Sequence, residues 1–153
     1  MNIFVLDRDP KIAAIMLCDK HIVKMIVETA QMLCTAASKL GHKVSYRPTH
    51  AKHPCTIWVG ESQSNWSWLI DHGLAMCEEY TRRYNRTHKT QAVIELCRDS
   101  NIGPVSDIGL TPFKLVMPDR YKCDDPVRSY RDYYIGEKSR FAKWKMEQPT
   151  WWV

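Results

Sequence analysis

The 153-residue sequence predicts a mainly α-helical fold: a compact, single-domain bundle of about four helices with long proline-rich loops. Apolar side chains recur at helical spacing through most of the chain. The steps Asp9-Pro10 and Asp125-Pro126 are typical of helix starts, where aspartate caps the first turn and proline takes its first position. Prolines interrupt the stretches 42–54 and 101–125. This length suits one domain, so we expect residues 1–153 to form a single globular unit.

The N-terminal part of the chain predicts one long helix with an interruption. Residues 3–6 form either a short strand or a buried N-terminal segment. A helical pattern then runs from Pro10 to Leu40, where Gly41 stops it. Because this is long for one helix, we expect a break near Cys18-Asp19, with Asp19 capping the second piece.

The middle of the chain predicts three more helices after an irregular stretch. Pro54 opens a short helix to about Val59, and Ser62 or Ser64 caps a long one that ends near Tyr84. Thr87 caps the third, which ends near Ser100. The apolar residues of this third helix that we expect to face inward are Ala92, Val93, Leu96 and Cys97.

The last quarter of the chain predicts an ordered loop, a helix and a docked tail. Residues 101–125 form the loop, because glycine and proline recur there. Pro126 begins the last helix, which we expect to continue to about Trp144. The tail 148–153 contains two tryptophans, so we expect it to pack on the body of the protein.

The amino-acid composition limits the class of protein to which this sequence can belong. The formal net charge is +5, with six tryptophans and seven tyrosines, which fits a small protein that binds nucleic acid. No stretch reaches the roughly 18 apolar residues of a membrane span, and we find no secretion signal. The six cysteines form no Cys-x-x-Cys pair, and we interpret them as reduced thiols of a cytoplasmic protein.

The most informative feature is a narrow polar stripe on an otherwise apolar helix. His21, Lys24, Glu28 and Gln31 are spaced three, four and three residues apart, which places them on one helical face. Apolar flanks predict that much of this helix is buried, so that a carboxyl with nearby bases lines a cleft and can act in acid–base catalysis. The alternative is a partly buried helix whose polar groups are satisfied by salt bridges.

Two other groups could take part in chemistry. The α-amine of Met1 leads almost directly into this helix, and an α-amine is substantially neutral at physiological pH, so it can act as a nucleophile. His50 and His53 could bind a metal together with His21. We favour hydrogen bonds from these loop histidines to phosphate or a carboxylate, and we predict no metal and no cofactor.

Basic residues form two groups that could grip phosphates. Between Arg120 and Lys145 there are eight Lys/Arg against four Asp/Glu, interleaved with aromatic residues, and this segment includes Arg128 and Arg131. The second group, with Arg82 and Arg86, lies at a predicted helix junction. The alternatives are a solvated basic helix face and stabilisation of a helix C-terminus.

The segment Cys18–Glu28 resembles the first helix of phage pyrimidine-dimer DNA glycosylases. That family has Asp-x-His followed seven residues later by its catalytic Glu, which matches Asp19, His21 and Glu28. The Pro149-Thr150-Trp151 step resembles the end of the family's chain. Gln31 stands where the family has an arginine.

The resemblance implies a DNA glycosylase with coupled AP (abasic-site) lyase activity on damaged pyrimidines. An N-terminal amine attacks the sugar C1′ and forms an imine, and the Glu helps expel the base. The family uses the amine of residue 2 after Met removal. Asn2 usually blocks that removal, so Met1 or a lysine such as Lys24 would serve here. The residues expected to be catalytic are Met1, His21, Lys24 and Glu28. Those expected to bind substrate are Asn2, Gln31, Tyr46, His50, His53, Arg82, Arg86, Arg128 and Arg131.

Two other interpretations of the function remain open at this point. One is a nucleotide- or DNA-base-modifying enzyme that uses Glu28 and the loop histidines without an imine. The other is a non-catalytic nucleic-acid-binding module. If the protein is a DNA glycosylase, we expect its partner to be damaged duplex DNA. We then expect no membrane association, no protein partner and a monomer. The protein would then act in the cytoplasm, which for a viral protein is that of the host.

Overall fold

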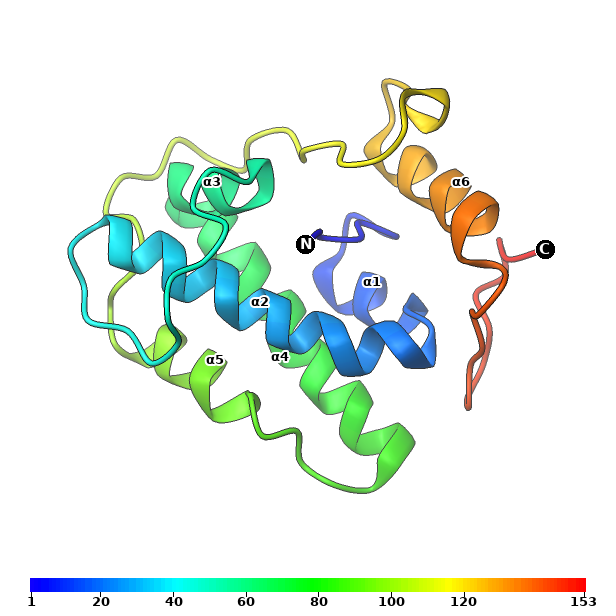
Figure 1. Cartoon of the computed structure of the whole chain (residues 1–153), viewed down its shortest axis with the longest axis horizontal. Coiled ribbons are helices and arrows are strands. Elements are labelled where there is room, and N and C mark those ends of the chain that lie inside the picture. Colours follow the sequence, from blue (N-terminus) through cyan, green and yellow to red (C-terminus); the bar gives the residue numbers. More distant parts are fainter.

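The bundle is organised around one long helix. In the computed structural model, which describes residues 1–153, α4 (Gln63–Tyr84) packs against α1, α2, α3 and α5 but not against α6. Figure 1 shows α2 crossing in front of α4, with α6 on the far side of the N-terminal segment. No strand forms, so the predicted mainly α-helical fold is confirmed. The remaining elements are α1 (Pro10–Met16), α2 (Asp19–Lys39), α3 (Pro54–Glu61), α5 (Gln91–Asp99), the 3-10 turn η1 (Asp119–Tyr121) and α6 (Pro126–Lys138).

The N-terminal segment is a buried, extended strap that no strand pairs with. Residues 3–6 are all buried in the hydrophobic core. The Phe4 ring lies edge-on to Tyr130 and Tyr134 of α6, with centroids 6.1 and 5.4 Å away. Of the two sequence alternatives, the buried segment is therefore the one that forms, and it fixes the position of residue 1.

The break between α1 and α2 falls where the sequence predicts it, but the predicted cap is wrong. Cys18 occupies the N-cap position of α2 and makes no side-chain capping bond. The Asp19 carboxylate instead accepts hydrogen bonds from Arg83 Nη1 and the Lys145 backbone, both at 3.1 Å. The buried Arg83 also donates to the Leu17 carbonyl at 2.8 Å, so this arginine fastens the break to α4.

The next two helix starts agree with the sequence, and the third does not. Pro54 begins α3, and Ser62 caps α4 by accepting from the Ser64 backbone at 3.1 Å. Thr87 is not the cap of α5, because residues 88–90 form a turn in which the Thr90 backbone donates to His88 Nδ1. Of the residues predicted to face inward, Cys97 is buried and Val93 half-buried, whereas Ala92 and Leu96 are exposed and Ile94 is buried instead.

The last helix is shorter than predicted, and the tail docks as predicted. It ends at Lys138 rather than near Trp144, because the following chain turns to bind the start of α2. There the Asp19 backbone donates to the Lys143 carbonyl at 2.8 Å. Trp144 Nε1 donates to the Met16 carbonyl at 3.0 Å, and Trp151 and Trp152 pack against the core.

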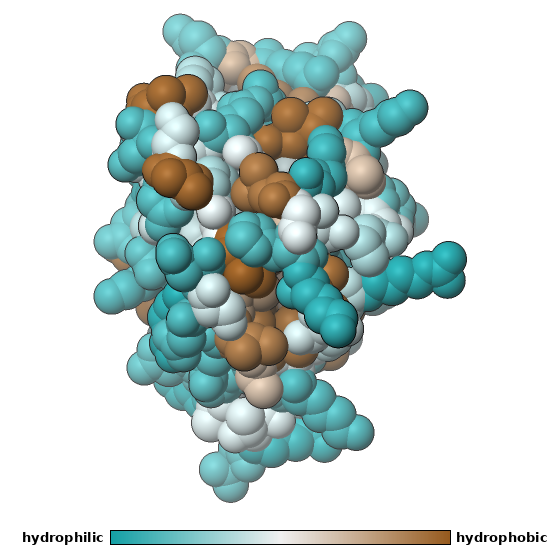
Figure 2. Space-filling model, turned by 90° about the vertical axis from the view of Figure 1, so that its left-hand side faces the viewer, coloured by the Kyte–Doolittle hydropathy of each residue, from teal (hydrophilic) through white to brown (hydrophobic).

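Hydrophobic and hydrophilic side chains are mixed on the surface. No helix is both long and apolar enough to cross a membrane. Figure 2 shows the side of the molecule that lies on the left in Figure 1, where hydrophobic residues sit between protruding hydrophilic side chains. Exposed apolar residues include Leu40, Ile57, Ile108 and Leu110. All six cysteines are free thiols, and five of them are buried.

Candidate active site

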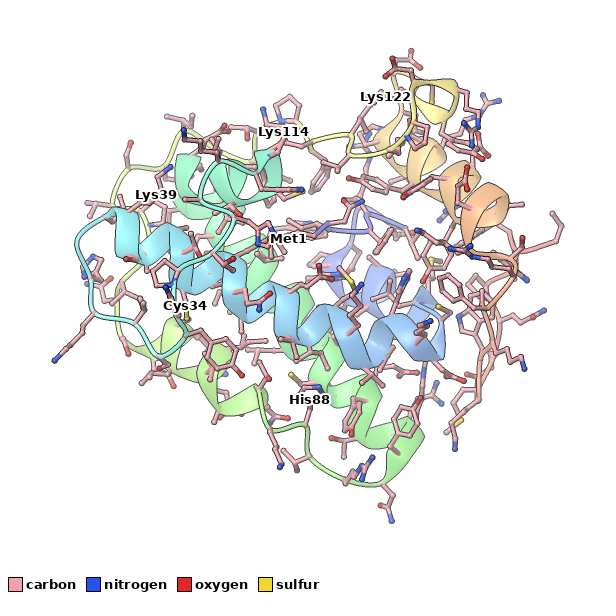
Figure 3. All side chains as sticks on the ribbon, in the orientation of Figure 1. Met1, Cys34, Lys39, His88, Lys114 and Lys122 are labelled. Carbon is pink, nitrogen blue, oxygen red and sulfur yellow. The ribbon has the colours of Figure 1, made fainter.

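The centre of the site is an ion pair between the first residue and the middle of α2. The Met1 α-amine lies 3.1 Å from Glu28 Oε1, and the two side chains are only 3% and 12% exposed. Ile22, Met25 and Ile26 of the same helix are also buried. Figure 3 shows Met1 beside the middle of α2. An amine and a carboxylate are therefore held together in a place with little water.

The side chain of Asn2 anchors the chain end that carries this amine. Its Nδ2 donates to the Val116 carbonyl at 2.8 Å, and its Oδ1 accepts from the Tyr130 hydroxyl at 2.9 Å and from the Ile3 backbone at 2.8 Å. Asn2 is 7% exposed. We predicted that Asn2 contacts substrate, but in the structure its polar atoms are occupied by protein partners.

The Met1 side chain is also held. Its Sδ accepts a weak hydrogen bond from Thr56 Oγ1 of α3 at 3.9 Å. Thr56 is buried, and Met1 packs against the hydrophobic core. The amine is thus fixed from both sides, by the thioether of its own residue and by Asn2.

His53 is the third polar group at the site. As the N-cap of α3, its Nδ1 accepts from the Cys55 backbone at 3.1 Å. Burial lowers the pKa of His53, and the positive charges of the Met1 ammonium and His50 lower it further. Glu28 and a hydrogen bond to the Met1 backbone oppose this shift. The pKa of His53 is therefore affected by both members of the ion pair.

His21, about two turns before Glu28 on α2, lies in the aromatic core rather than beside the amine. Its ring stacks on Phe4 with centroids 4.6 Å apart, and its Nδ1 shares a 2.6 Å hydrogen bond with the Tyr134 hydroxyl. Burial, together with Lys138, Lys24 and Lys20, lowers the pKa of His21 to about 3. His21 is therefore neutral at physiological pH and supports the strap that carries the amine.

Three lysines surround this buried histidine from different elements. Lys20 lies 4.8 Å above the Phe141 ring, and Lys138 lies 4.7 Å above the Tyr133 ring. Lys24 is exposed on α2, one turn before Glu28. None of the three pairs with a carboxylate, and we call this group the lysine cluster. These lysines give the surface around the buried His21 a positive charge.

The other predicted substrate-binding residues near α2 differ in their burial and in their contacts. Gln31 is half-buried on α2. Tyr46 donates to or accepts from Thr90 Oγ1 at 2.8 Å and so closes the loop onto α5. His50 is exposed and has a φ of +52°, a left-handed conformation that costs energy for a residue other than glycine.

The four predicted arginines are not gathered at the ion pair. Arg82 pairs with Glu79 and Glu147 at the far end of α4. Arg86 donates to the Tyr80 hydroxyl at 3.0 Å. On α6, Arg131 donates to the Leu6 carbonyl at 2.8 Å and Arg128 is exposed. Most of these guanidinium groups are thus occupied by protein partners.

Sequence reasoning missed several residues that build the site. Thr56, Tyr130 and Val116 hold residues 1 and 2, although they lie far from them in the chain. Tyr130 was part of the basic, aromatic segment, but no spacing rule links it to Asn2. Lys20 and Lys138 carried no signal beyond their charge.

No three His, Cys, Asp or Glu side chains come close enough together to hold a metal ion. His21 is enclosed by Phe4 and Tyr134, and His53 bonds the start of α3. The three histidines that the sequence offered as one metal site are therefore engaged separately.

One family model matches the chain. The model of the pyrimidine dimer DNA glycosylases covers residues 1–92, a range that contains the strap, α1 to α4 and both members of the ion pair. No curated protein and no solved structure matches the chain.

Proposed function

The chain belongs to the pyrimidine dimer DNA glycosylase family, and we propose that it acts through the Met1 α-amine, with AP lyase activity coupled to base removal. The observation that carries this proposal is the 3.1 Å contact between that amine and Glu28. An amine forms covalent intermediates with sugar carbons, and a neighbouring carboxylate supplies the proton transfers that such steps need.

The reaction would begin with the ion pair as it stands. Glu28 accepts a proton from the ammonium, which leaves the amine free to attack C1′ of the damaged nucleotide. The bond from C1′ to the base breaks as the bond from C1′ to nitrogen forms, and the base leaves with a proton. Opening of the sugar ring then gives an imine between Met1 and C1′.

The lyase step follows from the same pair. The imine makes the C2′ hydrogens acidic, and Glu28 is placed to remove one of them as a base. Elimination breaks the bond from C3′ to its oxygen and cuts the strand. Water then hydrolyses the imine and returns the free amine.

This proposal requires that Met1 remain on the protein. Its buried side chain and its contact with Thr56 support that requirement, because removal would leave the pocket of the thioether empty. Removal would also move the amine to Asn2, whose side chain is bound to Val116 and Tyr130. The intact mass of the protein reports directly whether Met1 is present.

We further propose that the lysine cluster binds the phosphates of the damaged strand. Lys20, Lys24 and Lys138 come from α2 and α6, on both sides of the strap, and are free of carboxylate partners. Phosphate contacts from such lysines give affinity without sequence preference. Damaged duplex DNA is the partner that this surface fits.

The decisive experiment is reductive trapping. Borohydride should convert the imine with abasic or dimer-containing DNA into a stable adduct, and peptide mapping should place that adduct on Met1. An adduct on a lysine would overturn the assignment of the nucleophile. Base release without any adduct would favour the alternative in which Glu28 acts by hydrolysis.

A further inference from the structure

The chain has a second basic surface, on the other side of the ion pair from the lysine cluster. It is formed by the connection between α2 and α3, residues 42–53, which we call the basic loop. We propose that the basic loop binds phosphates of the duplex on the side of the lesion opposite to those that the lysine cluster contacts. The identity of the partner rests on the proposed function, and the place of the contact rests on the geometry of the loop.

The basic loop lies in a part of the chain that contains no acidic residue. Between Glu28 and Glu61 there are four Lys/Arg and three His but no Asp or Glu. Lys43, Arg47 and Lys52 are exposed, and none of them pairs with a carboxylate. Arg47 is the only arginine of the chain whose guanidinium makes no hydrogen bond, ion pair or aromatic contact. A free guanidinium suits phosphate, because its N–H groups form a planar fork that matches two phosphate oxygens.

Hydrogen bonds hold the backbone of the loop in place. The hydroxyl of Thr35, a buried residue of α2, donates to the Thr49 carbonyl at 3.1 Å and accepts from the Thr49 backbone at 3.0 Å. Tyr46 bonds Thr90 at the start of α5, and His53 caps α3. The charged side chains therefore extend from a fixed backbone, and binding a phosphate orders less of the chain than it would in a free loop.

These contacts place the loop along the face of α2 that carries Glu28. Thr35 comes seven residues after Glu28, or about two turns, so the two side chains lie on the same side of the helix. Figure 1 shows the loop turning back from the end of α2 to the start of α3, where Thr56 contacts the Met1 side chain. Lys24 lies one turn before Glu28. The ion pair is therefore between the lysine cluster and the basic loop.

The separation of the two surfaces fits a short stretch of duplex. From Lys20 to Thr35 the rise along α2 is about 22 Å. At 3.4 Å for each nucleotide of a strand, this rise corresponds to about six or seven base pairs. A duplex that lies along α2 can thus contact the lysine cluster on one side of the lesion and the basic loop on the other, with the lesion at the amine.

The competing explanation is that the loop is basic only because it is solvated, and substitution separates the two cases. Arg47→Gln and Lys52→Gln each remove one exposed charge. On an undamaged duplex, which needs no chemistry at the amine, we expect each to reduce the slope of log K against log salt concentration by about 0.9. Arg98→Gln is the matched control, because this exposed arginine of α5 already pairs with Asp99 at 2.8 Å. Slopes for both loop variants equal to that of the control would overturn the proposal.

The second measurement places the contact relative to the lesion. Duplexes with one pyrimidine dimer are shortened to about two base pairs on one side of it or on the other, which removes the phosphates beyond. Base release is measured in single turnover below saturation. On the full-length duplex we expect Arg47→Gln and Lys24→Gln to slow it about threefold or more. Shortening one arm should abolish the effect of Arg47→Gln alone, and shortening the other arm should abolish the effect of Lys24→Gln alone. Loss of both effects with the same arm would overturn the proposal.

The outcomes separate this proposal from the proposed function. If no duplex releases a base while Arg47→Gln still lowers the salt slope, the mechanism through Met1 fails and the basic loop remains a DNA-binding surface. If both loop variants release the base at the wild-type rate and keep the wild-type slope, the mechanism stands and the basic loop lies outside the DNA-binding surface.

Discussion

The Tyr130 hydroxyl donates to Asn2 Oδ1 at 2.9 Å and joins two residues that are 128 positions apart. The Lys114 carbonyl lies 2.6 Å from the same hydroxyl, so the two acceptor oxygens share its one hydrogen. Through these contacts α6 and the loop before it hold the chain end that carries the amine. The site therefore depends on the C-terminal part of the chain, although its reactive groups lie in the first 28 residues.

Asn2→Ala should show this dependence. The substitution leaves the Val116 carbonyl without a donor and the Ile3 N–H without an acceptor, and we expect the free energy of unfolding to fall by about 1–3 kcal/mol. Base release should fall as well, because the amine loses its anchor. Urea unfolding and single-turnover cleavage measure the two effects. Tyr130→Phe removes one of the bonds to Asn2 and also takes a partner from the Lys114 carbonyl and the Val116 N–H, so its loss of stability should be similar. Its base release should fall less than that of Asn2→Ala, because Asn2 keeps its bonds to Val116 and Ile3. Equal losses of base release in both variants would argue against Asn2 as the main anchor.

Glu28→Gln should remove catalysis while leaving the fold in place. The amide has the same shape but cannot accept the amine proton, so we expect base release to fall by about 10²–10⁴-fold, the usual contribution of a general base. Single-turnover assays on an oligonucleotide with one pyrimidine dimer measure this. Glu78→Gln, at an exposed position of α4, is the control and should retain full activity. Full activity in Glu28→Gln would remove the basis for the mechanism.

The sequence predicted the helices best where a local signal marked their ends. Asp9 with Pro10, Pro54 and Ser62 each identified a true start, because capping acts within a few residues. The predictions failed where distant contacts decide. Thr90 binds Tyr46, so α5 begins later than Thr87 implied, and α6 ends early because the following chain binds Asp19.

For the candidate site, the sequence likewise predicted the burial of Glu28 but not which residue of the stripe faces the amine. Periodicity placed Glu28 on a buried helix, and the structure buries it. The same stripe gave no means of separating Glu28, which faces the amine, from His21, which faces Phe4 and Tyr134. That difference depends on the path of the strap, which long-range contacts of Asn2 determine.

Buried histidines should make the protein less stable in acid. Burial lowers the pKa of His72 to about 4, and the pKa of His21 is lowered to about 3, against an ordinary value of 6.5. The unfolded chain therefore binds more protons than the folded one below pH 6.5. Stability should be unaffected by these groups above that pH and should fall as the pH drops from 6.5 toward 4, by up to about 1.4 kcal/mol per pH unit for each histidine.

The variant His72→Gln tests this assignment. Urea unfolding at pH 7 and pH 5 gives the pH dependence of the free energy of unfolding, and the variant should lose less stability between the two than the wild type. The same substitution at the exposed His42 should leave the difference unchanged. An identical difference in His72→Gln and the wild type would show that His72 does not contribute to acid sensitivity.

The lysine cluster should determine how DNA affinity depends on salt. Each lysine that contacts a phosphate displaces counterions, so its loss should reduce the slope of log K against log salt concentration by about 0.9. We expect this for Lys20→Gln, Lys24→Gln and Lys138→Gln, with weaker binding to damaged and undamaged duplexes alike. Lys11→Gln, in the groove between α1 and α4, is the control. Fluorescence anisotropy over a salt series measures the slopes, and a slope for Lys24→Gln equal to that of the control would place the DNA elsewhere on the protein.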